Sequence, residues 1–226
     1  MVEGTGELSL RVARVAAPVR EQVRDLLRQA IVDLQLRPGH RLIERELIEE
    51  TGVSRTTIRE VLRELAAEGL VTTIPQKGAI VALPTADEAA EIYEVRAALE
   101  GLAAWRFVTH ASEADRAALR TAFAEVERVT VDGGDIRAML QAKNAFYKAL
   151  LDGAGNAVIR SMLAGLQARV SVLRSASLTR PGRPAEAVAE IRAVVDAMEA
   201  GDADAAAAAC AAHVEAAAQA GLEALS

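Results

Sequence analysis

Apolar residues recur at intervals of three and four positions over most of the chain, which is the period of an amphipathic α-helix. Between residues 44 and 65 two short patterns of this kind meet at Gly52. The second begins after Ser54, a hydroxyl residue suited to cap a helix, and its apolar stripe is Ile58, Val61, Leu62 and Leu65. The pattern predicts two helices joined by a tight turn.

The face opposite this stripe carries basic and hydroxyl side chains, namely Arg55, Thr56, Arg59 and Arg63. A helix with arginines at such intervals, entered through a tight turn, is typical of a helix-turn-helix that reads DNA. An amphipathic helical hairpin with a solvated charged face produces the same local pattern, so the flanking segments decide between the two interpretations.

The flanking segments favour a winged helix. An amphipathic helix is predicted from about Pro18 to Leu36, where Arg37-Pro38-Gly39 ends it because proline disfavours helix in the residue before it. The helix after Ser54 is expected to end at Gly69. Two β-branched segments, 70–74 and 79–83, are then joined by a turn that carries Lys77 and Gly78. Residues 1–16 show no clean period, and we expect a loose arm there.

Helical periodicity without any β pattern continues through residues 84–226. Helices are predicted over about 87–109, 112–131, 136–151, 156–177, 185–200 and 202–225. Such a series of antiparallel helices forms a bundle. The expected fold is therefore mainly α, with an N-terminal winged helix-turn-helix over residues 1–83 and an antiparallel all-helical bundle over residues 84–226.

Composition supports closely packed helices and an intracellular setting. Only 3% of the residues are aromatic, and alanine dominates the second half. No apolar run reaches membrane-spanning length, so no membrane association is expected. The one cysteine, Cys210, cannot form an internal disulfide, so we expect a cytoplasmic protein in which Cys210 is a small buried apolar residue.

The negative net charge of the whole chain argues against nucleic-acid binding, but this charge is not shared equally by the two regions. Residues 1–83 hold 12 Lys and Arg and 12 Asp and Glu, whereas residues 84–226 hold 14 and 20 and so carry the whole net charge of -6. Affinity for nucleic acid depends on a local basic patch rather than on the total. Cations gather around the proposed reading helix, at Arg41, Arg45, Arg55, Arg59, Arg63 and Lys77.

Several motifs follow one another in the first region: Leu36-Arg37-Pro38-Gly39-His40-Arg41-Leu42, Glu46-Leu47, Gly52-Val53-Ser54-Arg55-Thr56-Thr57-Ile58-Arg59-Glu60-Val61-Leu62, Glu68-Gly69-Leu70-Val71 and Pro75-Gln76-Lys77-Gly78-Ala79. In this order and spacing, residues 18–83 resemble the DNA-binding domain of the GntR family of bacterial transcription regulators. The resemblance implies that arginines reach guanine edges or phosphates, that hydroxyls hold the DNA backbone and that the wing enters the minor groove. The implied DNA-binding residues are Arg45, Ser54, Arg55, Thr56, Thr57, Arg59, Lys77 and Gly78.

The second region carries its own motifs, among them Tyr93-Glu94-Val95-Arg96, Phe146-Tyr147-Lys148-Ala149-Leu150-Leu151, Glu190-Ile191-Arg192 and Ala211-Ala212-His213-Val214. Together they resemble the FadR-like subfamily of GntR regulators, whose helical domain binds an effector and dimerises. Many members hold a divalent metal there through one Asp and three His, and the corresponding positions here are Lys143, Tyr147, Ile191 and His213. One imidazole does not hold a metal tightly, so we expect no metal and no cofactor.

Fixed side-chain cations are expected to replace that metal. If the bundle follows the subfamily, Arg96, Lys143, Tyr147 and His213 converge on a site suited to an organic carboxylate. Each has an ordinary alternative, because Arg96 and Lys143 can pair with Glu100 or be solvated, Tyr147 can be a core residue, and His213 can be a satisfied buried histidine.

The sequence thus predicts a homodimeric transcription regulator, expected to be a repressor, that binds operator DNA under the control of a small-molecule effector. One alternative is a regulator whose bundle serves only for dimerisation. Another is a helical-bundle enzyme fused to a DNA-binding domain, but three scattered histidines and one cysteine provide neither a nucleophile–base pair nor a metal cluster. We therefore expect no enzymatic activity.

Overall fold

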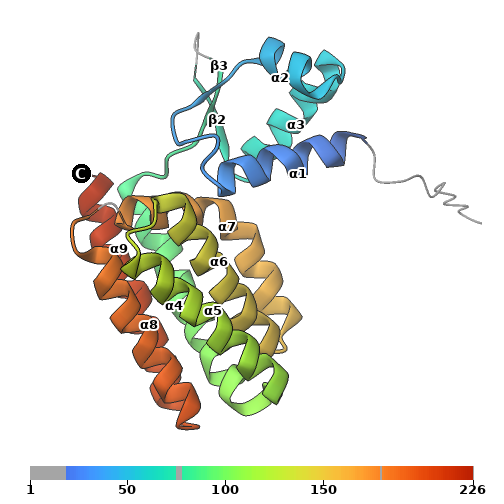
Figure 1. Cartoon of the computed structure of the whole chain (residues 1–226). Coiled ribbons are helices and arrows are strands. Elements are labelled where there is room, and N and C mark those ends of the chain that lie inside the picture. Colours follow the sequence, from blue (N-terminus) through green and yellow to red (C-terminus); the bar gives the residue numbers. More distant parts are fainter. Residues whose placement is uncertain (1–18, 75–77, 179, 226) are drawn as a thin grey trace, which may run out of the picture.

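A winged helix-turn-helix sits on one end of a helical bundle in the computed structural model, which describes residues 19–74, 78–178 and 180–225 (Figure 1). The expected loose arm over residues 1–16 and the wing residue Lys77 lie outside these ranges. The first unit contains α1 (Val19–Val32), β1 (Arg41–Leu42), α2 (Glu44–Thr51), α3 (Arg55–Ala67), β2 (Val71–Ile74) and β3 (Gly78–Val81).

The first helix ends earlier than the apolar spacing predicts, at Val32 rather than Leu36. After Val32 the chain turns through Leu34, whose φ of 54° is left-handed. The Leu36 amide donates to the Ala30 carbonyl, and the Leu36 side chain packs against the same core as α1. The apolar period therefore continues beyond the helix because a turn, and not another helical turn, returns Leu36 to the core.

The two predicted hairpin strands are present, and a third strand joins them. β3 pairs antiparallel with β2 on one side, with Thr72 opposite Ile80, and with β1 on the other, with Leu42 opposite Ala79. The sequence did not reveal β1, since two residues are too few to show an alternating pattern. This strand ties the segment before α2 to the wing, so the reading helices and the hairpin are held on one frame.

The second unit is the predicted all-helical bundle, and three of its helices begin at the polar caps that the sequence predicts. Thr85 and Ser112 each form a capping box, at the start of α4 and of α5. Asp202 accepts a hydrogen bond from the Ala205 amide before α9. The six helices that the described residues form here are α4 (Ala86–His110), α5 (Glu113–Val131), α6 (Ile136–Gly153), α7 (Ala157–Leu178), α8 (Arg183–Glu199) and α9 (Ala203–Leu225).

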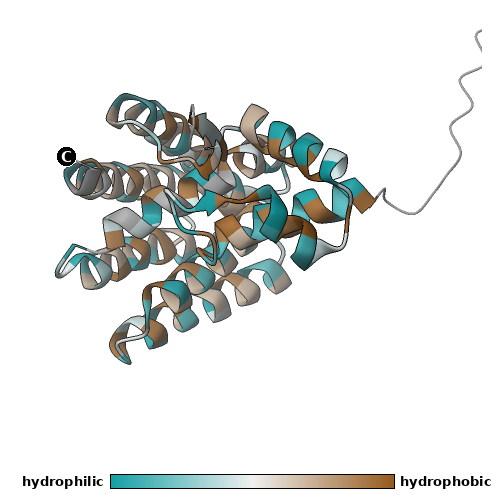
Figure 2. Cartoon of the chain, turned by 90° about the horizontal axis from the view of Figure 1, so that it is seen from above, coloured by the Kyte–Doolittle hydropathy of each residue, from teal (hydrophilic) through white to brown (hydrophobic). Residues whose placement is uncertain are grey.

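Each unit has its own hydrophobic core, and apolar residues line the facing sides of the helices (Figure 2). One buried cluster joins α1, α2, α3 and the sheet through Ile31, Ile58, Leu65 and Val81. The bundle holds two further clusters, one of them around Phe107, Phe146 and Leu150. Cys210 is buried in the bundle, as expected. No helix within the described ranges has the length and apolar character to cross a membrane.

The two units are also tied together at the end of α3. Arg169 of α7 donates to the carbonyl oxygen of Glu68 through Nε at 3.2 Å and Nη2 at 2.9 Å. The next residue, Gly69, has a φ of +71°, and a Cβ atom there would lie 2.1 Å from Arg169 Nη2. A glycine is therefore needed at this position both for the helix end and for the approach of the guanidinium.

Candidate functional site

The reading helix α3 is held by a turn and a cap that the sequence predicted. Gly52 has a φ of +70° and donates its amide to the Ile48 carbonyl, which ends α2. The Ser54 hydroxyl accepts from the Thr57 amide at 3.2 Å and contacts the Thr57 hydroxyl at 2.9 Å. Four buried side chains underneath, Ile58, Val61, Leu62 and Leu65, fix the helix against the core.

The predicted arginines project from this surface into solvent. The side chains of Arg45, Arg55 and Arg59 are 77%, 67% and 56% exposed. Arg59 Nε lies 2.9 and 3.1 Å from the two Glu44 carboxylate oxygens, and Arg55 Nε lies 3.9 Å from the same group. One carboxylate thus orients two guanidinium groups without burying them. Thr56 is exposed and Thr57 half-buried.

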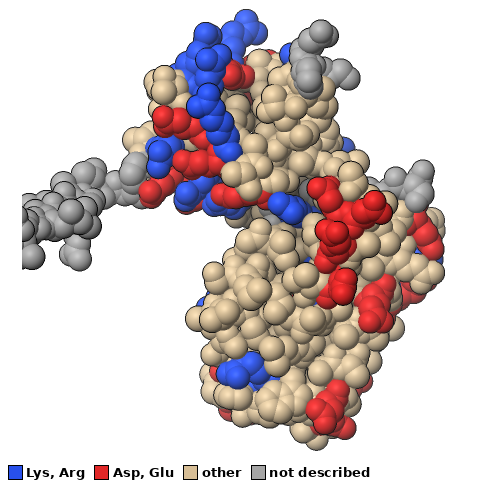
Figure 3. All heavy atoms as spheres, turned by 180° about the vertical axis from the view of Figure 1, so that it is seen from behind, with Lys and Arg blue, Asp and Glu red and all other residues tan. Residues whose placement is uncertain are grey.

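The wing glycine and the wider charge distribution fit the same surface. Gly78 has a φ of +81°, and a Cβ atom there would have no neighbour within 4 Å. Lys and Arg side chains gather at the winged-helix end, whereas Asp and Glu follow one side of the bundle (Figure 3). The acidic side of the bundle is therefore separate from the basic reading surface.

The bundle interior contains a cluster of buried or partly buried charged side chains, which we call the buried charge cluster. It consists of Arg96, Glu100, Lys143, Arg174, Arg183, Glu190 and His213. Burying a charge costs free energy unless it is paired and hydrogen-bonded. The pairs within the cluster therefore show which groups are already satisfied.

One half of the cluster has two guanidinium groups for a single carboxylate. Arg96 Nε donates to Glu100 at 2.8 Å, and Arg174 Nη2 lies 3.8 Å from the same carboxylate. Arg174 Nη1 donates to Asn144 at 3.0 Å, and its guanidinium lies 4.0 Å from the Tyr147 ring centroid. Despite burial, the two arginines keep the pKa of Glu100 below its ordinary value, so this half carries one uncompensated positive charge.

The other half is built on Glu190. Arg183 donates to both Glu190 oxygens at 2.6 and 2.7 Å, and His213 Nδ1 lies 2.5 Å from Glu190 Oε2. Although burial opposes it, these bonds lower the pKa of Glu190 to about 2. Burial and the Lys143 charge lower the pKa of His213 to about 4, so its imidazole is neutral at pH 7 and donates from Nδ1.

Lys143 has no carboxylate of its own within this network. Burial, then the charges of Arg174, Arg183 and Arg96, lower its pKa from 10.5 to about 7. The Lys143 amine is therefore only partly protonated near neutral pH. Several buried atoms of the region also lack a hydrogen-bond partner among the described residues: Arg96 Nη1, Tyr93 OH, Tyr147 OH, Ser171 Oγ, Arg174 Nε and Arg183 Nε.

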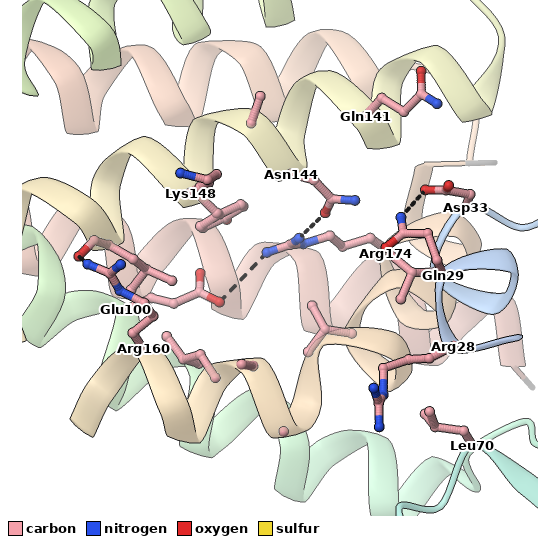
Figure 4. Close-up of a pocket in the computed structure, with 18 of the residues that line it drawn as sticks. Arg28, Gln29, Asp33, Leu70, Glu100, Gln141, Asn144, Lys148, Arg160 and Arg174 are labelled. Carbon is pink, nitrogen blue, oxygen red and sulfur yellow. Dashed lines mark hydrogen bonds and ion pairs between the residues drawn. The ribbon is translucent and has the colours of Figure 1, made fainter. Parts of the chain in front are cut away.

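A cavity of about 990 Å³ reaches the first half of the cluster (Figure 4). The most deeply buried polar residues that line it are Glu100, Arg174 and Tyr147. Together with Asn144, which is hydrogen-bonded to Arg174, we call them the inner end of the cavity. Its volume lies at the upper end of the roughly 300–1,000 Å³ range of small-molecule sites. A cavity that ends on an incompletely paired guanidinium can hold an anion with oxygen acceptors.

The structure brings the four predicted effector residues into one interior, but not onto one surface. Arg96, Lys143, Tyr147 and His213 are all buried, and of these only Tyr147 lines the large cavity. Arg96 is paired with Glu100, which is the ordinary alternative for it. The residue that sequence reasoning missed is Arg174. The feature of the sequence that indicates Arg174 is its position, four residues after Val170 and one after Leu173, on the buried face of α7.

The residues at the metal positions of the resembled subfamily do not fit a metal. Ile191 is a fully buried hydrocarbon, and the one imidazole, His213, already bonds Glu190. Among the described residues, no group of three or more His, Cys, Asp or Glu is arranged to hold an ion. Lys143 supplies a cation where a metal ligand would have to be an anion or a neutral donor.

Comparison with known proteins gives a consistent result for both units. A family model described as "Bacterial regulatory proteins, gntR family" matches residues 19–81, and one described as "FCD domain" matches residues 91–216. The chain is 33% identical to a probable D-xylose utilization operon transcriptional repressor of Paenarthrobacter nicotinovorans over 81% of this chain and 80% of that protein. It is 28% identical to a putative L-lactate dehydrogenase operon regulatory protein of Escherichia coli (strain K12), over 86% and 83% of the two chains.

Solved structures show the same fold. A putative transcriptional regulator GntR from Rhodococcus sp. RHA1 superposes with a TM-score of 0.74 at 24% identity, over 89% of this chain and 96% of that one. E. coli McbR/YncC superposes with a TM-score of 0.73 at 22% identity, over 88% and 95%. At these identities the likeness concerns the fold alone.

Replacing Lys143 by methionine is expected to stabilise the protein at neutral pH. Between pH 7 and 10.5 the unfolded chain holds a proton that the folded protein has released, so wild-type stability rises with pH over this window. Lys143→Met should raise the free energy of unfolding by about 1–3 kcal/mol at pH 7, and the gain should shrink toward pH 10. Urea unfolding at several pH values measures it.

The matched control is Lys148→Met, which removes an exposed lysine from the same helix. It should change the free energy of unfolding by less than about 0.5 kcal/mol at every pH. A loss of stability in Lys143→Met at pH 7 would show that the Lys143 ammonium is well compensated after all.

Proposed function

We propose that an organic carboxylate in the bundle controls how a homodimer of this protein binds operator DNA. The chain belongs to the GntR family of bacterial regulatory proteins and carries an FCD domain. Family membership makes the chain a DNA-binding transcription regulator and not an enzyme. We propose that the regulator represses transcription. It would act in the cytoplasm, where bacterial operator DNA lies.

The DNA contacts that we propose come from α2, α3 and the wing. Arg45, Arg55 and Arg59 are exposed and long enough to reach base edges or phosphates, as an arginine fork bonds both O6 and N7 of guanine. Ser54, Thr56 and Thr57 are hydroxyl residues at the start of α3, where the amide groups and helix dipole favour phosphate. Gly78 leaves space for close approach to the minor groove.

The observation that supports a carboxylate is the unequal pairing around Glu100. Arg96 and Arg174 bring two positive charges to one carboxylate, at the inner end of a cavity that is open to solvent on its other side. A single ligand carboxylate would neutralise the excess charge.

A homodimer is supported by an apolar stripe on α4. Val95, Ala98, Leu102 and Trp105 follow the three- and four-residue spacing of one helix face, and all are exposed in the single chain. Exposed apolar side chains in a continuous row are typical of a protein interface. Two copies joined along this face would present two reading helices, which matches the two half-sites of a symmetric operator.

Arg59→Ala is expected to weaken binding to the chain's own upstream operator by about 1–3 kcal/mol and to reduce the salt dependence of binding. The physical reason is the loss of one charge-assisted contact to DNA. Fluorescence anisotropy over a salt series measures both quantities. Arg120→Ala, which removes an exposed arginine from α5, is the control and should leave operator affinity within twofold, that is within about 0.4 kcal/mol.

Arg174→Met is expected to abolish the response to carboxylates. Hexanoate should raise the melting temperature of the wild type, whereas the neutral hexanamide should not, because only the acid carries the charge that Arg174 binds. In Arg174→Met the affinity for hexanoate should fall about tenfold to hundredfold. Arg160→Met alters an arginine that lines the same cavity but is paired with Asp152. It should keep the response, and equal losses in both variants would contradict an anion site at Arg174.

Leu102→Glu is expected to disrupt the dimer, because a charge in the middle of an apolar interface cannot be desolvated without cost. Sedimentation equilibrium should give a dimer for the wild type and a monomer for the variant at micromolar concentration. Val131→Glu changes the most exposed large apolar side chain on α5 and should remain dimeric. A wild-type monomer at high concentration would refute the proposal.

A further inference from the structure

The cavity that ends at Arg174 has walls from both units of the chain. On the bundle side it is lined by α6 and α7 and reaches Glu100 of α4. The opposite side is formed by residues of the winged helix, which are Arg28, Gln29, Val32, Asp33, Glu68 and Leu70. In Figure 4, Gln29 and Asp33 lie beside the backbone end of Arg174, whose guanidinium points away from them toward Glu100 and Asn144, and Arg28 and Leu70 lie on the same side as Gln29. A molecule that fills this space therefore touches the DNA-binding unit directly.

The charged groups in the outer part of the cavity are satisfied by one another. Arg28 donates to both Glu68 oxygens at 3.0 and 2.5 Å, and Lys148 and Arg160 share the carboxylate of Asp152 at 2.6 and 2.9 Å. Arg174 differs from these three cations, because its nearest carboxylate oxygen is 3.8 Å away. The charge of a ligand is thus directed inward, to the Arg174 end.

The rest of the outer cavity offers neutral contacts. Gln29, on the winged-helix side, presents an exposed amide whose one described hydrogen bond goes to Asp33 at 3.0 Å. Gln141 of α6 adds a second amide, and Leu70 and Leu163 add apolar surface. Amides exchange hydrogen bonds with hydroxyl groups, and aliphatic walls take a hydrocarbon chain. The outer part therefore suits the uncharged body of a ligand.

The cavity also adjoins the contact that joins the units. Glu68 lines the cavity with its side chain, while its carbonyl oxygen accepts both bonds from Arg169 of α7. Because Glu68 directly follows α3, this contact fixes the C-terminal end of the reading helix to the bundle. A ligand that presses the winged-helix wall away from α7 would have to lengthen these bonds.

We propose that the effector is an elongated monocarboxylate that spans from Arg174 to Gln29, and that it bridges the bundle and the DNA-binding unit. Its carboxylate occupies the inner end, which rests on the function proposed above, and its uncharged end contacts α1. Binding then favours the arrangement of the two units that best fits the ligand length, which shifts the population of states that fit the operator. The Arg169–Glu68 contact transmits this choice to α3.

A series of ω-hydroxy acids with two, four, six and eight carbons tests the span, with affinity measured by calorimetry on the full chain. Affinity should increase with length in the wild type, by about tenfold or more from the shortest to the longest acid. Gln29→Trp narrows the outer part and should weaken the longest acid about tenfold while leaving the shortest within about twofold. Leu26→Trp adds the same side chain to an exposed position of α1 that does not line the cavity, and should change neither.

The outcomes separate this inference from the proposed function. If the acids bind in an Arg174-dependent way but Gln29→Trp affects all lengths equally or none, the bridging ligand is refuted and the carboxylate site stands. If no acid binds to the wild type, both fall.

Arg169→Ala tests the transmission step. It should leave the affinity for 8-hydroxyoctanoate within about twofold, because Arg169 does not line the cavity. The shift in operator affinity that this acid causes in the wild type should be lost. A full acid-dependent shift in Arg169→Ala would refute the role of this contact.

Discussion

The cost of removing charged side chains from water governs the interior of the bundle. Three arginines, a lysine and two glutamates lie among its helices, and each pair of opposite charges offsets part of the cost of burial. Glu190 is compensated by Arg183 and His213. Glu100 cannot compensate both Arg96 and Arg174. An interior with surplus positive charge is less stable than a balanced one, which is the physical basis of the anion site proposed above.

The reading helix connects this interior to DNA because its two ends have different partners. At the N-terminal end, Ser54 caps the helix and Glu44 orients Arg55 and Arg59 toward solvent. At the C-terminal end, Gly69 allows the close approach of Arg169 from the bundle. The rigid apolar underside of α3 keeps the two ends in a fixed relation. In the bridging mechanism proposed above, a small rotation at the Arg169 end would therefore displace the arginines at the other end.

Features that depend only on neighbouring residues could be predicted from the sequence, whereas features that depend on packing between distant segments could not. The caps at Ser54, Thr85 and Ser112 and the glycine turns were visible because each needs only neighbouring residues. The end of α1 was placed four residues too late, because the turn at Leu34 keeps Leu36 in the core. The division of the chain at residue 83 remains a prediction.

The predicted interior site shows the same limit. Family spacing led to Lys143, Tyr147 and His213, and all three are buried in the bundle. Their pairing could not be read from the sequence, since Glu190 reaches His213 from another helix, 23 positions away. Arg174 was missed because a helical period alone does not say which face of α7 meets the cavity. Whether any of these residues binds an effector remains a prediction.

A lysine at a metal position does not simply replace the metal. A divalent ion keeps its charge at any physiological pH and binds ligand oxygens directly. Burial and three neighbouring guanidinium groups bring the pKa of Lys143 to about 7, so this side chain carries only part of a positive charge in a neutral cell. Arginine is not deprotonated under such conditions. In the carboxylate site proposed above, the constant attraction for an anion would therefore come from Arg174, whose charge does not depend on pH in this range.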